Sequence, residues 1–231
     1  MPTTNATSPK TVTIRGRLSF PRFTHAEAVA ANKKSKFPKA KEEDVSSEFN
    51  LLVEQEQLDK LKDHIRNVFV PYVEENYAKD PKSKDSLDPK TVKKLLDKLD
   101  NDDWDGAPFL PIKSISEKNQ EAAPEAVASI KITGPKGADV SLKAAVYDEG
   151  QLLVPDGDIL SYPVIKPIGQ TVFQMYAGAY VAATMNLFAF FSSTTVNGVS
   201  AGANTAVYLG NIEGERFGGG SDIDEDAIFM D

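Results

Sequence analysis

The sequence predicts a mainly β fold: a small antiparallel barrel with inserted helices, giving an α+β chain with disordered termini. Two observations predict it. Short segments of alternating apolar and polar residues lie toward both ends of the chain, and only 55–70 and 88–99 carry apolar residues at helical spacing. Several strands with few interleaved helices favour a barrel over a parallel sheet. With 231 residues and 41% hydrophobic content, the chain can build one sizeable core, or one core with an inserted subdomain.

The first strand is expected at 11–20, after a polar arm at 1–10 that we expect to be disordered. Its alternation points one set of side chains inward and places the others, including Arg15 and Arg17, on the outward face; the inward set is Val12, Ile14, Leu18 and Phe20. Gly16 interrupts the apolar side, which suits a bulge or a strong bend at a barrel corner. Residues 24–46 then form a polar, lysine-rich connection that is too charged for a core.

The middle of the chain is helical and acidic. A second strand is expected at 48–53, followed by a helix over about 55–70. Asp88 and Pro89 supply an N-cap and a first-turn proline for another helix that ends near Leu99. Residues 72–125 are therefore interpreted as a partly helical, acidic insertion in a binding domain that spans 11–216.

The last hundred residues are again rich in strand patterns. Strands are expected at 126–133 and 139–147, joined by a hairpin turn at 134–137, with short segments at 152–154 and 164–168. A long strand at 172–191 and a final strand at 205–212 follow, and the polar, glycine-rich stretch between them, 192–204, is expected to be a loop. The glycines of 217–221 predict a flexible hinge into an acidic tail at 217–231.

The long strand has two unlike faces. Its odd positions, from Phe173 to Phe191, are all apolar and predict a core face, whereas its even positions mix polar groups with aromatic rings. Aromatic faces stack on nucleobases of any sequence. We therefore predict that four aromatic residues contact bases: Tyr176, Tyr180, Phe188 and Phe190. The alternative, in which Phe188 and Phe190 cover a second core under the insertion, stays open.

Charge is strongly segregated along a chain whose net charge is −8. Residues 1–40 contain eight basic side chains and one acidic one, and 161–210 contain no acidic residue. Because cations that neutralise phosphates dominate nucleic-acid affinity, this distribution predicts a basic binding surface. Its candidate residues, with two interleaved aromatic residues, are Arg15, Arg17, Arg22, Phe23, Lys33, Lys34, Lys36, Phe37 and Lys39.

The tail combines acidic and large apolar side chains. This pattern suits docking into basic pockets of partner proteins, and competition with DNA for a basic groove. The residues expected to dock are Asp222, Asp224, Glu225, Asp226, Phe229 and Asp231.

Other classes of function find little support in the sequence. Cysteine is absent, which excludes disulfides and thiolate chemistry. Asn101, Asp103 and Asp105 imitate the start of a calcium loop, but Ile112 stands where that loop requires glutamate. We therefore expect no metal, no cofactor, no catalysis and no membrane segment.

Two blocks of the chain resemble a known family. The segment TIRGRLSFPRF at 13–23, and the blocks YAGAY, MNLFAF and VYLGNIEGERFGGG at 176–220, are similar to bacteriophage single-stranded-DNA-binding proteins. The resemblance covers roughly 11–55 and 160–231. It implies an OB-like barrel, sequence-nonspecific single-strand binding in phage DNA replication or recombination, and contacts of the tail with replication or recombination proteins in the host cytoplasm. A homo-oligomer stays open, and the rival interpretation is a β-rich structural or assembly protein of a virion.

Overall fold

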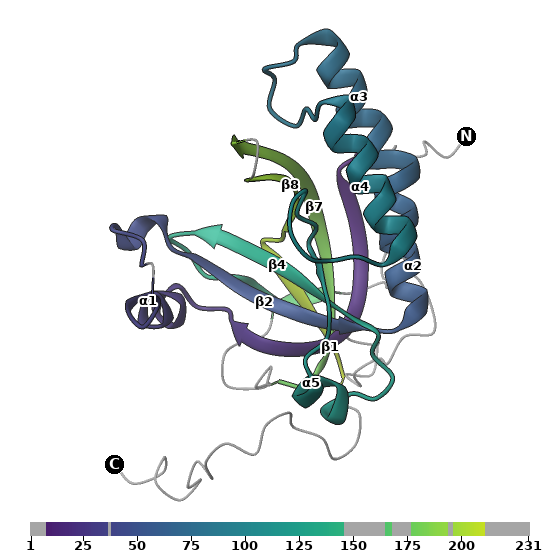
Figure 1. Cartoon of the computed structure of the whole chain (residues 1–231). Helices are drawn as coiled ribbons and strands as arrows, with labels where there is room; N and C mark the ends of the chain where they lie inside the picture. Colours follow the sequence, from purple (N-terminus) through teal and green to yellow (C-terminus); the bar gives the residue numbers. More distant parts are fainter. Residues whose placement is uncertain (1–7, 37, 146–164, 168–176, 194–195, 211–231) are drawn as a thin grey trace, which may run out of the picture.

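A computed structural model describes residues 8–36, 38–145, 165–167, 177–193 and 196–210, and it shows a mixed α/β chain with one large sheet (Figure 1). The strands are β1 Thr11–Arg22, β2 Ser46–Val53, β3 Ile112–Lys113, β4 Ala128–Lys136, β5 Ser141–Ala145, β6 Ile165–Pro167, β7 Tyr180–Ser193, β8 Val196–Gly202 and β9 Thr205–Gly210. The helices are α1 His25–Lys33, α2 Gln55–His64, α3 Val70–Lys79, α4 Pro89–Asn101 and α5 Glu117–Ala122, with a 3₁₀ turn at Glu42–Asp44 and a π-helical turn at Ile65–Phe69.

Strand β1 organises the sheet because it pairs with two partners. Residues 11–17 pair with β7 and residues 17–22 pair with β2, both antiparallel. Strand β2 pairs with β4, β4 meets β8 through the single parallel pair Thr133–Gly202, and β8 pairs with β7. The pairings of these five strands therefore return to their starting point, while β9, β5 and β6 extend the sheet from β7.

Strand β1 changes partners at Gly16 and Arg17, where Figure 1 shows it curving strongly. A Cβ atom on Gly16 would lie 2.4 Å from the carbonyl oxygen of Leu52 on β2. Only glycine lets the two backbones approach this closely. The bend expected at this residue is therefore confirmed.

The core follows the alternation of the strands. Val12, Ile14 and Leu18 of β1 are buried, and so is the odd-numbered face of β7 from Val181 to Leu187, as predicted. They join one cluster with residues of β2, β4, β8 and the helices, including Phe49, Leu51, Ile130, Ile132, Leu61, Ile65 and Leu95. Two residues assigned to inward faces are corrections, because Phe20 is 59% exposed and Phe191, near the end of β7, is 65% exposed.

The helix expected to end at residue 70 continues through Pro71 to Lys79. Proline cannot donate the usual backbone hydrogen bond, and its ring crowds the preceding turn. The chain adapts with the π-helical turn, in which the N–H of Val70 donates to the oxygen of Ile65. Helix α4 lies beside this long helix, and its N-cap is Asp88, as predicted.

Three other expectations were wrong. The connection at 24–46 contains helix α1, which begins with a capping box made by Thr24 and Glu27. Residues 134–136 stay in β4 rather than forming a hairpin turn, and β5 pairs in parallel with β9 instead of with β4. The expected loop at 192–204 contains strand β8, in which small residues allow close packing: a Cβ atom on Gly198 would lie 2.1 Å from the oxygen of Phe109.

Several predicted features lie outside the described residues. They are the segment 152–154, the first part of the long strand, the terminal arm at 1–7 and the acidic tail. Within the part of the chain that the structure describes, no helix is long and apolar enough to cross a membrane.

Candidate nucleic-acid interface

The outward side chains of β2 and β4 form a polar surface next to the end of β1. Glu48 of β2 lies opposite Thr133 of β4, and Asn50 lies opposite Lys131. Their neighbours along both strands point into the core, so this side of the sheet is left to polar groups. We call this surface, with Phe20 and Arg22 of β1, the β2–β4 face.

One carboxylate positions two cations on this face. Glu48 forms ion pairs with Arg22 and Lys131, each at 2.7 Å, and all three side chains are between 32% and 44% exposed. Ion pairs this open to solvent contribute only about 0–1 kcal/mol, so a phosphate can take the place of the carboxylate. The sequence identified Arg22, and it missed Lys131, whose position depends on the pairing of strands far apart in the chain.

Phe20 is an exposed aromatic residue two positions before Arg22 on β1. The pairing of β1 with β2 shifts register between Ser19 and Arg22, and Phe20 has a φ of 48° at this bulge. A positive φ is unfavourable for a bulky residue and is typical of functional positions when it occurs. The bulge turns the ring out of the core. Pro21 was the available sequence signal, because proline inside a strand commonly marks a bulge.

The lysine cluster lies in the connection between β1 and β2. Lys33 pairs with Glu42 at 2.9 Å, and the Lys39 Nζ donates to the backbone oxygen of Asp44 at 2.7 Å. Lys34 and Lys36 are exposed and form no ion pair with any described residue. Phe37 lies outside the described residues. Fewer of these lysines are therefore available for phosphate contact than the sequence suggests, because the acidic 3₁₀ turn beside them neutralises part of their charge.

Asp44 links this connection to the β2–β4 face. Its carboxylate lies 3.6 Å from the Nζ of Lys136 at the end of β4, and the N–H of Gly137 donates to Val45 in the same region. The lysine-bearing connection thus ends against the edge of the polar surface. The predicted cations Arg22, Lys34 and Lys36 belong to neighbouring parts of the fold.

Arg17 and Phe23 do not lie on an open surface, which corrects the prediction. The side chain of Arg17 is 4% exposed; its Nη1 pairs with Glu125 at 3.2 Å and its Nε donates to Gly178. The segment around α5 covers this part of the outward face, where Ala123 and Ala126 pack on Leu52. Phe23 is buried and packs against Phe49, with ring centroids 5.2 Å apart.

Arg15 and Tyr180 lie in acidic surroundings. Arg15 is near Glu56 of α2, at 3.9 Å, and its backbone N–H donates to Gln57. Tyr180 is half-buried, and this burial raises the pKa of its hydroxyl above 10.0. The negative charge of Glu54 raises this pKa further, whereas the positive charge of Arg15 lowers it. These surroundings favour a packing role over phosphate contact. Tyr176 lies outside the described residues.

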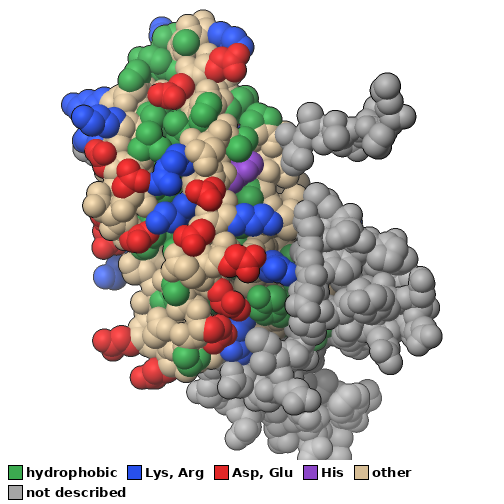
Figure 2. Space-filling view, turned by 90° about the vertical axis from the view of Figure 1, so that its right-hand side faces the viewer, with side chains coloured by type: hydrophobic (Ala, Val, Ile, Leu, Met, Phe, Trp, Pro, Cys, Tyr) green, Lys and Arg blue, Asp and Glu red, His purple; other side chains and the backbone are tan. Residues whose placement is uncertain are grey.

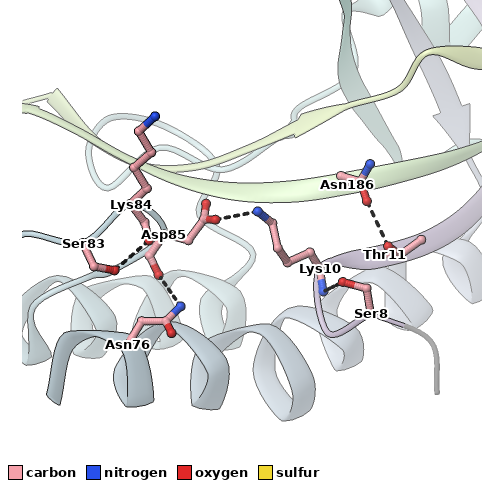
Figure 3. A network of polar contacts seen from close by, with 8 residues as sticks. All are labelled: Ser8, Lys10, Thr11, Asn76, Ser83, Lys84, Asp85 and Asn186. Carbon is pink, nitrogen blue, oxygen red and sulfur yellow. Dashed lines mark hydrogen bonds and ion pairs between the residues drawn. The ribbon is translucent and has the colours of Figure 1, made fainter. Parts of the chain in front are cut away.

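Phe188 and Phe190 line a hollow of about 890 Å³ between the end of β7 and the connection from α3 to α4. Both rings are partly buried, and Phe191 beside them is 65% exposed. Lys10 crosses the space between β1 and this connection to pair with Asp85 (Figure 3). The predicted aromatic residues therefore form a second location, on another part of the molecule's surface.

On the face of the helices drawn in Figure 2, acidic residues pair with several of the basic ones. Figure 2 looks onto α2, α3 and α4 and shows basic and acidic side chains intermixed. Arg66 pairs with Asp100, and Lys62 pairs with Asp102 at 2.6 Å. No group of three or more histidine, aspartate or glutamate side chains that could hold a metal ion occurs among the residues with described positions.

Comparison with known proteins gives structural likeness only. No protein-family model matches the chain, and no curated protein matches it in sequence. Among solved structures, it is similar to the single-stranded DNA-binding protein from bacteriophage Enc34, with 12% identity, a TM-score of 0.47 and coverage of 95% of this chain and 90% of that one. The same Enc34 protein in complex with ssDNA matches with 10% identity and a TM-score of 0.47 over 90% of each chain.

The single-stranded DNA-binding protein gp2.5 of bacteriophage T7 is also similar. It has 12% identity and a TM-score of 0.45, with 89% of this chain and 94% of that chain covered. These proteins are named for binding DNA. The likeness is distant in both fold and sequence.

Proposed function

We propose that this protein binds single-stranded DNA without sequence preference, through an OB-like barrel, and performs no catalysis. One observation carries the proposal. The pairings run β1-β2-β4-β8-β7 and back to β1, with only β4 and β8 parallel. This order supports an OB-like barrel, a class in which the second and third strands and adjoining loops bind oligonucleotides. Here those strands are β2 and β4, and their outward side is the β2–β4 face.

The chemistry of this face suits a single strand of any sequence. Phe20 offers a ring for base stacking, which does not distinguish between bases. Arg22 and Lys131 offer cations for phosphates, and Lys34 and Lys36 add charge from the neighbouring connection. Neither kind of contact selects a base. We infer nonspecific coating and protection of single strands in phage DNA replication or recombination.

The acidic tail has a separate proposed role. Its five carboxylates and Phe229 suit docking into basic pockets of replication or recombination proteins in the host cytoplasm. The same charges suit competition with DNA for the β2–β4 face.

The proposal is tested by fluorescence titration with a labelled oligo-dT of about 30 nucleotides, which exceeds the about 4–16 covered by one OB fold. We expect tight binding at low salt that weakens as salt rises, with a slope of log K against log salt of about −0.7 per phosphate contact. A folded protein that binds no oligo-dT at low salt would contradict the proposal and favour a virion assembly role. Binding that does not respond to salt would show that these cations are not the contact surface.

Phe20 provides the sharpest test of the face itself. Phe20→Ala should weaken oligo-dT binding by about 1–3 kcal/mol, because one stacked base is lost. Its stability should change little, because the ring is exposed and alanine bears the same backbone penalty as phenylalanine at a φ of 48°. The matched control is Val127→Ala, another exposed apolar residue, which should leave binding unchanged. Equal affinities of Phe20→Ala and the parent protein would show that Phe20 does not contact DNA.

A further inference from the structure

The hollow beside β7 has the size and walls of a binding site. We define the β7 hollow by Phe188–Phe191 on one side and Pro81–Asp88 on the other. Its volume of about 890 Å³ is within the about 300–1,000 Å³ usual for ligand sites. A smaller hollow of about 320 Å³ adjoins it, because Phe191 and Asp88 line both.

The residues that line the two hollows carry a net positive charge. Lys82 and Lys84 line the β7 hollow, and Lys90 and Lys94 line the adjoining one. All four are exposed, and none forms an ion pair with another residue of the described ranges. The two acidic residues of the walls are already engaged: Asp85 pairs with Lys10, and Asp88 accepts hydrogen bonds from the backbone of Lys90 and Thr91. The site therefore attracts anions.

The wall opposite β7 is fixed in place before any ligand binds. Asn76 of α3 donates to the oxygen of Asp85 at 3.2 Å, and Ser86 donates to the oxygen of Ser83 at 2.8 Å. Figure 3 shows the Asn76–Asp85 bond of this network, with the amino group of Lys84 pointing away from the Lys10–Asp85 pair. A preformed wall lowers the entropy lost on binding.

Strand β8 lies between the β2–β4 face and the β7 hollow. Thr133, on that face, pairs with Gly202 of β8, and Gly202 lies opposite Asn186 of β7. A Cβ atom on Gly202 would lie 3.3 Å from the Phe188 ring and 3.4 Å from the oxygen of Thr133. The Phe188 ring therefore lies beside Gly202, between the end of the β2–β4 face and the hollow.

We propose that the β7 hollow is a second subsite for single-stranded DNA, which takes the stretch that continues from the β2–β4 face. Phe191 and Phe190 stack on bases there, and the lysines of both hollows contact phosphates. This inference rests on the proposed function and extends it. A long DNA single strand crosses β8 at Gly202 and occupies both locations, whereas a short oligonucleotide binds to the β2–β4 face alone.

The test compares two oligo-dT lengths in the full-length protein: about 6 nucleotides, which fits one OB fold, and about 25, which exceeds it. The variants are Phe191→Ala and the double substitution Lys84→Gln with Lys94→Gln. Each should weaken binding of the long oligonucleotide about tenfold and leave the short one within about twofold. The double variant should also make the salt slope of the long oligonucleotide shallower by about 1.4, because two phosphate contacts are lost.

The matched control is Lys60→Gln with Lys118→Gln, which removes the same charge from exposed lysines of α2 and α5. This control should bind both lengths like the parent protein. The proposal is overturned if the hollow variants bind the long oligonucleotide as the parent does. An equal loss in the control would also overturn it. If the folded parent binds neither length, the proposed function itself fails, which is a distinct result.

Discussion

Arg17 shows how far the surroundings of one residue can change its role. It stands at an outward position of β1, where alternation predicts contact with solvent, yet α5 and the segment after it cover the side chain. A buried guanidinium persists only where carbonyl and carboxylate groups satisfy it. Glu125, Gly178 and Ala122 provide those groups.

Arg17→Ala should therefore act on stability and not on DNA binding. We expect the free energy of unfolding to fall by about 2–3 kcal/mol, because hydrogen bonds to a charged group are lost and their partners stay behind. Urea denaturation measures this, and oligo-dT affinity of the folded variant should stay within about twofold of the parent. The control Glu125→Gln should cost less, because its amide oxygen can still accept from Nη1 of Arg17 and the carbonyls of Gly178 and Ala122 stay in place. A large loss of affinity without loss of stability would indicate that Arg17 contacts DNA after all.

The sequence predicted residue roles unevenly. Alternation correctly identified the buried faces of β1 and β7, because burial of apolar side chains decides those positions locally. It failed for Arg17, which elements distant in sequence bury, for Phe20, which a bulge turns outward, and for Phe191, which is exposed near the end of β7. Phe23, which was assigned to the basic surface, is buried as well. Lys131 escaped notice because its partner Glu48 lies on another strand.

At the scale of elements, Gly16 determines whether β1 can pair with both β7 and β2. Gly16→Ala should lower the free energy of unfolding by about 3 kcal/mol, because its Cβ would overlap a backbone oxygen that cannot move aside easily. The control is Gly106→Ala, where the added Cβ meets nothing within 4 Å and only the φ of 70° opposes it. We expect that control to cost about 1 kcal/mol in the same denaturation experiment. Similar losses for the two variants would show that the close approach at Gly16 is unimportant.

Elements with a strong local pattern were predictable, and those shaped by packing were not. Helix α4 was identified from Asp88, Pro89 and its apolar spacing. Strand β8 was missed because its sequence, VNGVSAG, is rich in glycine and polar residues. Those small residues are required there by the Phe109 backbone and the Phe188 ring, and neither contact is visible in the local sequence.

At the scale of the whole molecule, the segregation of charge predicts that the tail regulates binding. Deleting residues 218–231 should tighten oligo-dT binding at low salt, because five carboxylates on a glycine hinge compete with DNA for the same cations. A short flexible tether gives the tail an effective concentration of about millimolar. The difference should shrink as salt screens the charges. A salt series on the full-length and truncated proteins measures it.

A full-length variant separates the charge of the tail from its bulk. In it the five acids become amides, at Asp222, Asp224, Glu225, Asp226 and Asp231, so that the tail keeps its length. This variant should bind like the truncated protein. Equal affinities of the parent and truncated proteins at low salt would show that the tail does not visit the DNA-binding face.

The double pairing of β1 also has a consequence for synthesis on the ribosome. Thr11 bonds to Asn186, 175 residues later, so the first strand made is among the last to be completed. At a translation rate of about 5–20 residues per second, about 10–35 seconds pass between the synthesis of β1 and that of β7, and during this time one backbone edge of β1 is unpaired. Such an edge invites pairing with other nascent chains. Expression at high levels should therefore give aggregates that form before the chain is finished, and slower initiation should raise the folded yield.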